Sequence, residues 1–270
     1  MSLKHLLVHL DSTERARLRL ELAVTLAKRC GAVLTGVFAE SAHLGPSIVA
    51  MRHPERMESA LAEARAAFEA KVSAARLPNE WWAVDRGDYG HMVGWTVQCC
   101  RYGDLAIFGQ YDPAASRVPA DLVEQVLIGS GRPLLVIPSQ WHESDMGRRV
   151  LVAWTGSREA ARAVNDSIPL MQDAEEVTVV ALQNGDDANG ALTPPVDIVA
   201  HLNAHGIAAR YERSPVDATS AVDVLLNRAA EMEADLMVMG GRQQGFPFAV
   251  QSRSVREIMR ATACPVLLSH

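Results

Sequence analysis

The chain has 270 residues, of which 49% are hydrophobic and 21% charged, so it can form the buried cores of two ordinary domains and is not a disordered polymer. Its formal net charge is −6, and no dense run of Lys and Arg offsets it, which argues against a nucleic-acid-binding protein. No segment approaches the roughly 20 apolar residues of a membrane-spanning helix, and the N-terminal apolar run is too short for a secretory signal. The four cysteines, Cys30, Cys99, Cys100 and Cys264, form no disulfide framework. We therefore expect a cytoplasmic protein that binds neither nucleic acid nor a membrane.

The first half of the sequence alternates strand-like and helix-like patterns. Apolar runs predict five strands, at residues 4–10, 32–39, 81–84, 104–108 and 133–137. Apolar residues spaced as on one face of a helix predict helices that end at Gly31 and that span residues 55–75, 92–101 and 120–127. Gly31 is expected to cap the first helix at its end, and Asp11, Ser12 and Thr13 offer caps at its start. This alternation predicts an α/β fold, with a mostly parallel sheet covered by helices on both faces.

The same order of segments then occurs a second time. Three segments have similar counterparts: LLVHLDS at 6–12 and VLVAWTG at 150–156, DLAIFG at 104–109 and DLMVMG at 235–240, and RPLLVIP at 132–138 and CPVLLSH at 264–270. Matches that keep their order along the chain indicate an internal duplication. We therefore predict two domains, residues 1–140 and 148–270, joined by a polar linker at residues 141–147.

Several segments of the second half resemble the universal stress protein family. They are VAWTGSREAARAV at 152–164, ADLMVMGG at 234–241 and REIMRATACPVLLSH at 256–270. The resemblance covers nearly the whole chain, twice, as in tandem members of that family. It implies two tandem Rossmann-like or flavodoxin-like domains, each an open five-stranded parallel sheet of order 3-2-1-4-5 flanked by helices. In such a sheet a ligand crevice opens where the strand order reverses, so Asp11 and Gly109 should line the first crevice, and Thr155 and Gly240 the second.

ATP-binding members of the family carry G-x2-G-x9-G-[ST] after their fourth strand and an Asp after the first. The glycines let backbone approach the ribose and phosphates, and the last pair presents N–H groups at a helix N-terminus. The second half matches this motif only in part, because Gln243 stands at the second glycine position and Thr155 replaces the Asp. The resemblance therefore implies a degenerate site for ATP or another adenine nucleotide, or no cofactor at all. Its candidate residues are Thr155, Gly240, Gly241, Gly245, Arg253 and Ser254, with Arg242 as a further anion contact.

The first half departs from the motif in a different way. It keeps Asp11 and Gly109, but Asp112 stands at the second glycine position and Asp121 lies near the start of the last helix. An Asp at a helix N-terminus caps the helix and repels a triphosphate. We therefore expect Asp121 to cap its own helix and the first cradle to be empty.

Other candidate groups have simpler explanations. His201 and His205, four residues apart, could share a metal, but no third ligand is evident, and two solvated histidines explain them better. The pair Cys99 and Cys100 lacks a neighbour that would activate a thiol. No nucleophile–base or acid–base signature indicates catalysis.

Three candidate functions follow, of which the first two belong to different classes. The favoured one is a non-enzymatic stress-response regulatory or binding module. The alternative is an ATP-binding protein that hydrolyses ATP slowly with the second-half loop, and a third is a carrier for another small ligand near Thr155. Family resemblance also implies that the fifth strands, 134–137 and 266–268, pair within one chain as a pseudo-dimer, because an unpaired sheet edge needs a partner. Two chains could further associate as a homodimer.

Overall fold

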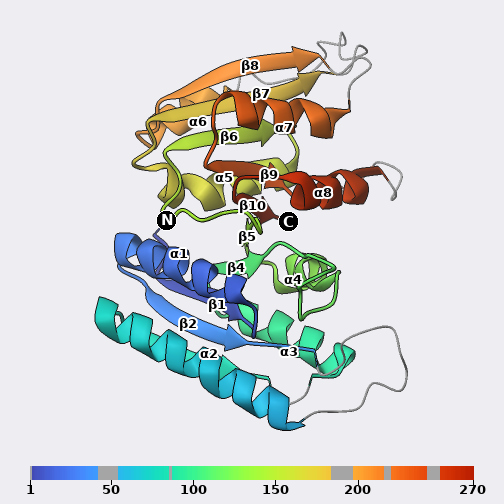
Figure 1. The fold of residues 1–270 in the computed structure, drawn as a ribbon. Helices are drawn as coiled ribbons and strands as arrows, with labels where there is room; N and C mark the ends of the chain where they lie inside the picture. The colour runs from blue at the N-terminus through green and yellow to red at the C-terminus, as the bar shows by residue number, and fades with distance from the viewer. Residues whose placement is uncertain (1, 42–53, 85–86, 184–196, 216–219, 242–249) are drawn as a thin grey trace. The chain divides into compact units, whose positions relative to one another are not determined.

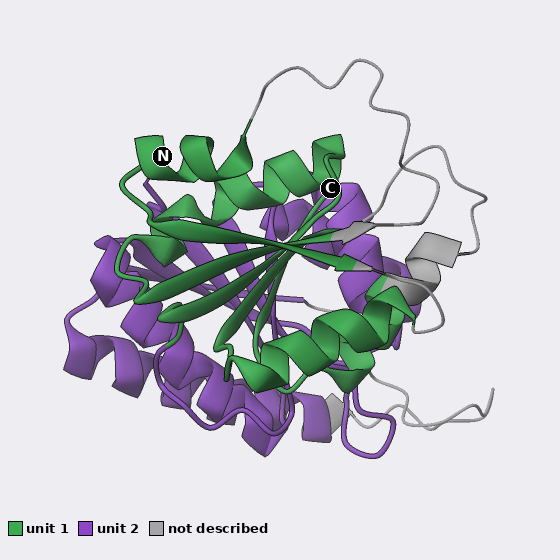
Figure 2. Ribbon diagram, turned by 90° about the horizontal axis from the view of Figure 1, so that it is seen from above, with its two compact units in different colours: residues 1, 146–270 green, residues 2–145 purple. Residues whose placement is uncertain are grey.

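The structure, a computed structural model, describes residues 2–41, 54–84, 87–183, 197–215, 220–241 and 250–270 (Figure 1). The chain divides into two compact units, residues 2–145 and residues 146–270, which Figure 2 shows in different colours. Each unit alternates strands and helices, so the predicted α/β class is confirmed. Among the described helices, none combines the length and the apolar character needed to cross a bilayer.

Residues 2–145 form a parallel sheet in which β1 lies between β2 and β4, with β3 outside β2 and β5 outside β4. The strands are β1 (His5–Leu10), β2 (Val33–Phe38), β3 (Asn79–Ala83), β4 (Leu105–Gly109) and β5 (Leu134–Ile137). The helices are α1 (Glu14–Cys30), α2 (Pro54–Ala75), α3 (Tyr89–Cys100) and α4 (Leu122–Ser130). Helices α1 and α2 contact each other, as do α3 and α4, and the two pairs cover opposite faces of the sheet (Figure 1).

Residues 146–270 repeat this arrangement of strands. Here β6 lies between β7 and β9, with β8 outside β7 and β10 outside β9, and all of these pairs are parallel. The strands are β6 (Arg149–Trp154), β7 (Glu176–Gln183), β8 (Ala209–Pro215), β9 (Leu236–Gly240) and β10 (Val266–Ser269). The helices are α5 (Arg158–Met171), α6 (Ile198–Ala204), α7 (Ala221–Glu231) and α8 (Val250–Ala261).

Local sequence signals account for several element ends. Gly31 follows α1 in the left-handed conformation, with φ 59°, and its N–H donates to carbonyls of the last turn, as expected. Helix α4 runs to Ser130, beyond the predicted end at residue 127, because the residue that adopts the left-handed cap is Gly131, with φ 68°. Helix α3 begins earlier than predicted, at Tyr89, because the Asp88 side chain accepts the His91 N–H and caps it.

The aspartate that begins each of the duplicated segments DLAIFG (104–109) and DLMVMG (235–240) has a structural role. Asp104 accepts the backbone N–H groups of Lys4 at 2.7 Å and His5 at 3.0 Å, at the start of β1. Asp235 accepts three such groups at the start of β6, from residues 147, 148 and 149, at 2.9 to 3.1 Å. Hydrogen bonds to a charged group are stronger than neutral ones. Each aspartate therefore fixes the first strand of its unit to the fourth, and the repeat preserves this contact.

Candidate functional site

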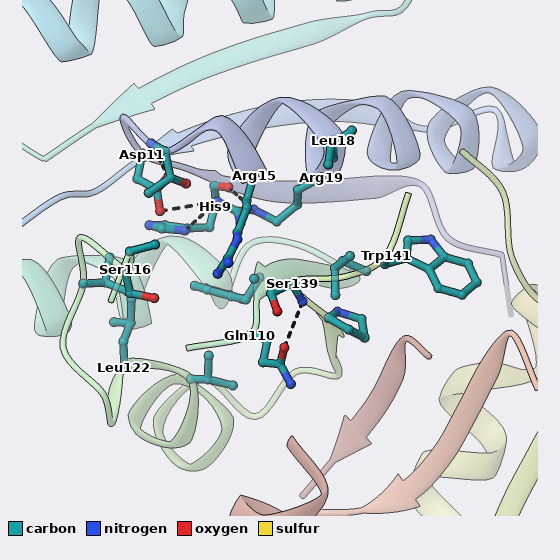
Figure 3. A pocket seen from close by; sticks show the side chains of 18 residues that line it. His9, Asp11, Arg15, Leu18, Arg19, Gln110, Ser116, Leu122, Ser139 and Trp141 are labelled. Carbon is teal, nitrogen blue, oxygen red and sulfur yellow. Dashed lines mark hydrogen bonds and ion pairs between the residues drawn. The ribbon is translucent and has the colours of Figure 1, made fainter. Parts of the chain in front are cut away.

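The predicted crevice of residues 2–145 lies at the carboxyl ends of β1 and β4. Strand order reverses there, because the chain leaves β1 for β2 on one side and reaches β4 on the other. Asp11 follows β1 and Gly109 ends β4, and both line this crevice as predicted from the sequence. Figure 3 shows the residues around it, which come from β1 and α1 with their connection, from β4 and β5 with the segments that follow them, and from the start of α4.

A buried arginine that sequence reasoning missed fills the inner part of the crevice. Arg19 projects from α1, and only 4% of its surface is exposed. Its Nε donates to the His9 carbonyl at 2.7 Å, and its Nη2 lies 3.6 Å from Asp11 Oδ2 and 3.4 Å from His9 Nδ1 (Figure 3). Asp11 also accepts the backbone N–H of Thr13 at 3.0 Å and its hydroxyl at 2.5 Å. The guanidinium and the carboxylate thus compensate each other inside the protein, where an isolated charge would be costly.

Asp11 stays ionised in this network. Burial by itself would raise the pKa of the Asp11 carboxyl, but the Arg19 guanidinium, His9 and the Thr13 donors together hold that pKa below its usual value. Thr13 stands at the N-cap of α1, yet its side chain makes no cap hydrogen bond. Its hydroxyl instead donates to Asp11, so the short polar residues before α1 organise the crevice as well as the helix.

The hydrogen bonds of His9 define its tautomer. His9 Nε2 lies 2.8 Å from the Ala39 carbonyl, which can only accept, so Nε2 carries the proton and Nδ1 faces Arg19 as an acceptor. The ring stacks on Phe108, with centroids 5.3 Å apart. Burial, and next the Arg19 guanidinium, lowers the pKa of His9 to about 4. His9 is therefore neutral and is a poor base at neutral pH.

The position of the Arg19 side chain requires a glycine at position 109. A Cβ at this position would lie 2.2 Å from Arg19 Nη1, which is closer than van der Waals contact allows. The sequence predicted this glycine as one that lets backbone approach a phosphate. In the structure, the guanidinium occupies the space that the missing side chain leaves.

A second arginine closes the outer part of the crevice. Arg15, which projects from α1 (Figure 3), forms an ion pair with Asp112, with 2.7 Å between Nη1 and Oδ2. The Ala114 N–H and then the Arg15 side chain hold the pKa of Asp112 below its usual value. The remaining cavity measures about 30 Å³, whereas ligand pockets typically measure about 300–1,000 Å³. This space accommodates one or two water molecules, and it does not accommodate a nucleotide in the observed conformation.

The prediction that Asp121 caps its own helix is wrong. Asp121 stands at the N-cap of α4 but makes no side-chain cap hydrogen bond. Its Oδ2 accepts the Tyr89 hydroxyl at 2.6 Å and the Gln125 amide at 3.3 Å instead. The side chain is drawn away from the helix end by these partners, which come from α3 and from one turn further along α4.

In residues 146–270 the structure describes one side of the corresponding crevice. Thr155 is exposed, and its hydroxyl donates to Ser157, which caps α5 by accepting the Ala160 N–H at 3.1 Å. A Cβ at Gly240 would lie 2.8 Å from the Ala160 nitrogen, so α5 approaches the end of β9 closely. The Gly241 N–H donates to the Ser269 carbonyl at 2.7 Å. Arg242, Gly245 and the side chains of Arg253 and Ser254 lie outside the described residues.

At the positions that correspond to the buried network, the described part of the second unit carries different residues. In the register of the duplicated segments, His9, Asp11 and Arg19 correspond to Ala153, Thr155 and Ala163. All three members of the network are therefore replaced together. Gly109 and Gly240 occupy equivalent positions, but a guanidinium lies beside the first and helix backbone beside the second.

A signal for the missed arginine was present in the sequence. Arg19 precedes Leu22 and Leu26 on the buried face of α1, and a charged residue in such a stripe indicates a buried partner. The expectation of two solvated histidines holds for His205, which is exposed, but not for His201, whose Nε2 is buried. Their rings meet edge to face at 4.8 Å, and the described residues hold no group of three or more metal-ligating side chains. Burial raises the pKa of the Cys99 thiol to about 12, so this thiol is not activated.

Comparison with known proteins identifies the fold. No protein-family model matches the chain, and no curated protein matches it. Among solved structures, a universal stress protein from Archaeoglobus fulgidus DSM 4304 superposes with a TM-score of 0.73 at 17% identity, over 98% of this chain and 97% of that one. A protein assigned to the universal stress proteins, from Pseudomonas aeruginosa UCBPP-PA14, superposes with a TM-score of 0.60 at 14% identity, over 99% of this chain and 93% of that one. A functionally unknown protein from Pseudomonas aeruginosa PAO1 superposes with a TM-score of 0.58 at 14% identity, over 99% of this chain and 92% of that one. The chain has the fold of universal stress proteins in a tandem arrangement over nearly its whole length.

The low pKa of His9 predicts a pH-dependent stability. Unfolded His9 has an ordinary pKa of 6.5 and folded His9 one of about 4, so the unfolded chain takes up a proton first as the pH falls. The contribution is complete above pH 6.5 and is lost between 6.5 and 4, up to about 3 kcal/mol. The pKa of Asp11 is lowered from 3.8, so protonation of Asp11 affects stability only below this pH range. His9→Gln should therefore reduce the loss of unfolding free energy between pH 7 and pH 4.5 by about 2 kcal/mol.

The measurement is urea unfolding followed by fluorescence in a Trp154→Phe background, where every remaining tryptophan lies in residues 2–145. His142→Gln, at an exposed position, is the matched control and should keep the full pH dependence. If the unfolding free energies of the His9 and His142 variants depended equally on pH, His9 would not be held neutral by its surroundings.

A double-mutant cycle tests the contact between Arg19 and Gly109. Gly109→Ala should destabilise residues 2–145 by about 1–3 kcal/mol because its methyl group displaces the guanidinium. In an Arg19→Lys background, which keeps the charge beside Asp11, the same change should cost about 1 kcal/mol less. The same fluorescence assay applies. Gly94→Ala, in α3 with open space around its Cβ, should not destabilise the protein, and additive effects at positions 19 and 109 would contradict the contact.

Proposed function

We propose that this chain is a tandem universal stress protein, a non-enzymatic binding module of the cytoplasmic stress response. In this proposal, residues 1–140 and 148–270 are two flavodoxin-like domains, and residues 141–147 are the linker. The full-length likeness to a universal stress protein fold supports the architecture. The regulatory role comes from the resemblance of the segments around Thr155 and Gly240 to that family.

One observation carries the assignment to a non-enzymatic class: the first crevice is closed by its own charges. Arg19 is compensated by Asp11 and Arg15 by Asp112, and a cavity of about 30 Å³ remains. Catalysis by proton transfer needs a base whose pKa lies near the working pH and that reaches the substrate. His9, with a pKa of about 4 and an Nε2–H donated to Ala39, meets neither requirement.

Any adenine nucleotide would therefore bind in residues 146–270. The site in this proposal is degenerate and consists of Thr155, Gly240 and Gly241 on the described side, with Gly245, Arg253 and Ser254 completing it. The geometry at Thr155 supports this choice, because its side chain is exposed, whereas Asp11 is buried against Arg19. Slow ATP hydrolysis at this loop is the alternative function.

Native purification without added nucleotide, followed by acid release and mass spectrometry, tests the proposal. We expect less than one adenine nucleotide per chain and no change of Tm on addition of ATP with magnesium. A stoichiometric nucleotide that is lost in Arg253→Ala and Ser254→Ala variants would instead establish the ATP-binding alternative. A nucleotide that is retained in those variants but lost in Arg15→Ala would place the ligand in the first crevice, and would contradict its closure.

We further propose that β5 and β10 pair within one chain as a pseudo-dimer. Within its own unit each strand has one paired neighbour, β4 for β5 and β9 for β10, and a free apolar edge promotes aggregation. Peptides that cover residues 134–137 and 266–269 should resist hydrogen exchange as strongly as those that cover β1 and β6. This protection should not change on dilution. Fast exchange at both edges, or protection that is lost on dilution, would contradict an intramolecular pair.

A further inference from the structure

A second cavity lies on the other side of α1, between α1 and α2. Its volume is about 300 Å³, ten times that of the crevice and at the lower end of the range for small-molecule pockets. Its apolar wall consists of two leucines and four alanines: Leu10, Leu20, Ala16, Ala60, Ala64 and Ala67. The cavity belongs entirely to residues 2–145, and the proposed nucleotide site does not include it.

The alanines explain why this space is unfilled. Further along the two helices, large side chains and an ion pair close the interface: Phe68 and Val72 are buried, and Lys71 Nζ lies 2.5 Å from Glu21 Oε1. Toward the start of α1, the facing side chains are single methyl groups, which cannot span the gap between the helices. The rim of this space is open to solvent, because Ser12, Glu14, Arg17 and Glu63 are exposed. A ligand with an apolar body would remove the apolar wall from water, which is favourable.

The charges around the cavity select the sign of the ligand. Three carboxylates line it, Asp11, Glu14 and Glu63, against one guanidinium, Arg17. Asp11 is compensated by Arg19. Glu63 accepts a hydrogen bond from the Ser59 hydroxyl at 2.9 Å. Because this hydroxyl is neutral, the contact does not compensate the charge of Glu63. Among the described residues that line the cavity, Glu14 and Glu63 remain against the single Arg17, so this lining carries an excess of one negative charge.

We propose that this cavity binds a small organic cation, an alkylammonium whose chain lies along the alanine wall and whose ammonium group lies among Glu14 and Glu63. The apolar lining accounts for the alkyl part, and the carboxylates account for the charge. This site would operate whether or not the chain binds a nucleotide. Because Asp11 lines both this cavity and the crevice, occupancy on one side of α1 would be felt at the other.

Titration of the full chain with n-butylammonium chloride, followed by amide NMR shifts, tests the proposal. Ala16, Ala60, Ala64 and Ala67 should shift together and saturate at millimolar concentration. Butyrate and n-butanol have the same alkyl chain with the opposite charge or none, and both should bind at least about fivefold more weakly. Equal binding of butyrate would overturn the assignment of charge, and shifts that do not saturate would overturn the site.

Three variants locate the binding. Ala64→Leu fills the cavity and should weaken n-butylammonium binding at least about tenfold, in line with the loss of an apolar contact surface. Ala66→Leu places the same side chain on the exposed face of α2 and should leave binding and Tm unchanged. Glu63→Gln should weaken binding about two- to fivefold. Unchanged affinity in Ala64→Leu, with a folded spectrum, would show that the cation binds elsewhere.

Discussion

The buried guanidinium of Arg19 is the constraint on which the first crevice depends. A guanidinium keeps its charge at any pH at which the protein is folded, so its burial requires acceptors on every side. The His9 carbonyl, His9 Nδ1 and Asp11 supply them, and position 109 must lack a side chain to leave room. The inner part of the crevice, where a ligand could otherwise bind, is thus filled by Arg19 and belongs to the packed core.

Helix α1 links the two spaces of this unit because it presents different residues to each. Arg15 and Arg19 face the crevice, four residues apart, whereas Ala16 and Leu20 face the cavity toward α2. The large charged side chains fill one space, and the small apolar ones leave the other unfilled. The second unit shares the strand arrangement but carries Ala153, Thr155 and Ala163 where the first has the network, so the duplicated fold supports different residues at the same topological position.

The sequence predicted more of the fold than of the site. Strand and helix positions followed from hydrophobic periodicity, and Gly31 from helix-capping chemistry, because both depend on neighbours a few residues apart. Asp11 and Gly109 were placed correctly in the crevice, but for a different reason from the one the structure gives. Asp121 was misjudged because its partner Tyr89 is remote in sequence, and no local rule pairs these two positions.

By itself, the sequence determined the α/β class, the duplication and the edge of the first sheet at which a crevice forms. These properties are set by periodic burial and by short-range capping, which a linear pattern records. Only the tertiary structure decided what fills the crevice, because His9, Arg19 and Gly109 come from β1, α1 and β4 and meet only when those elements pack. It also decided where space remains, since the hollow between α1 and α2 depends on which small side chains face each other across two helices.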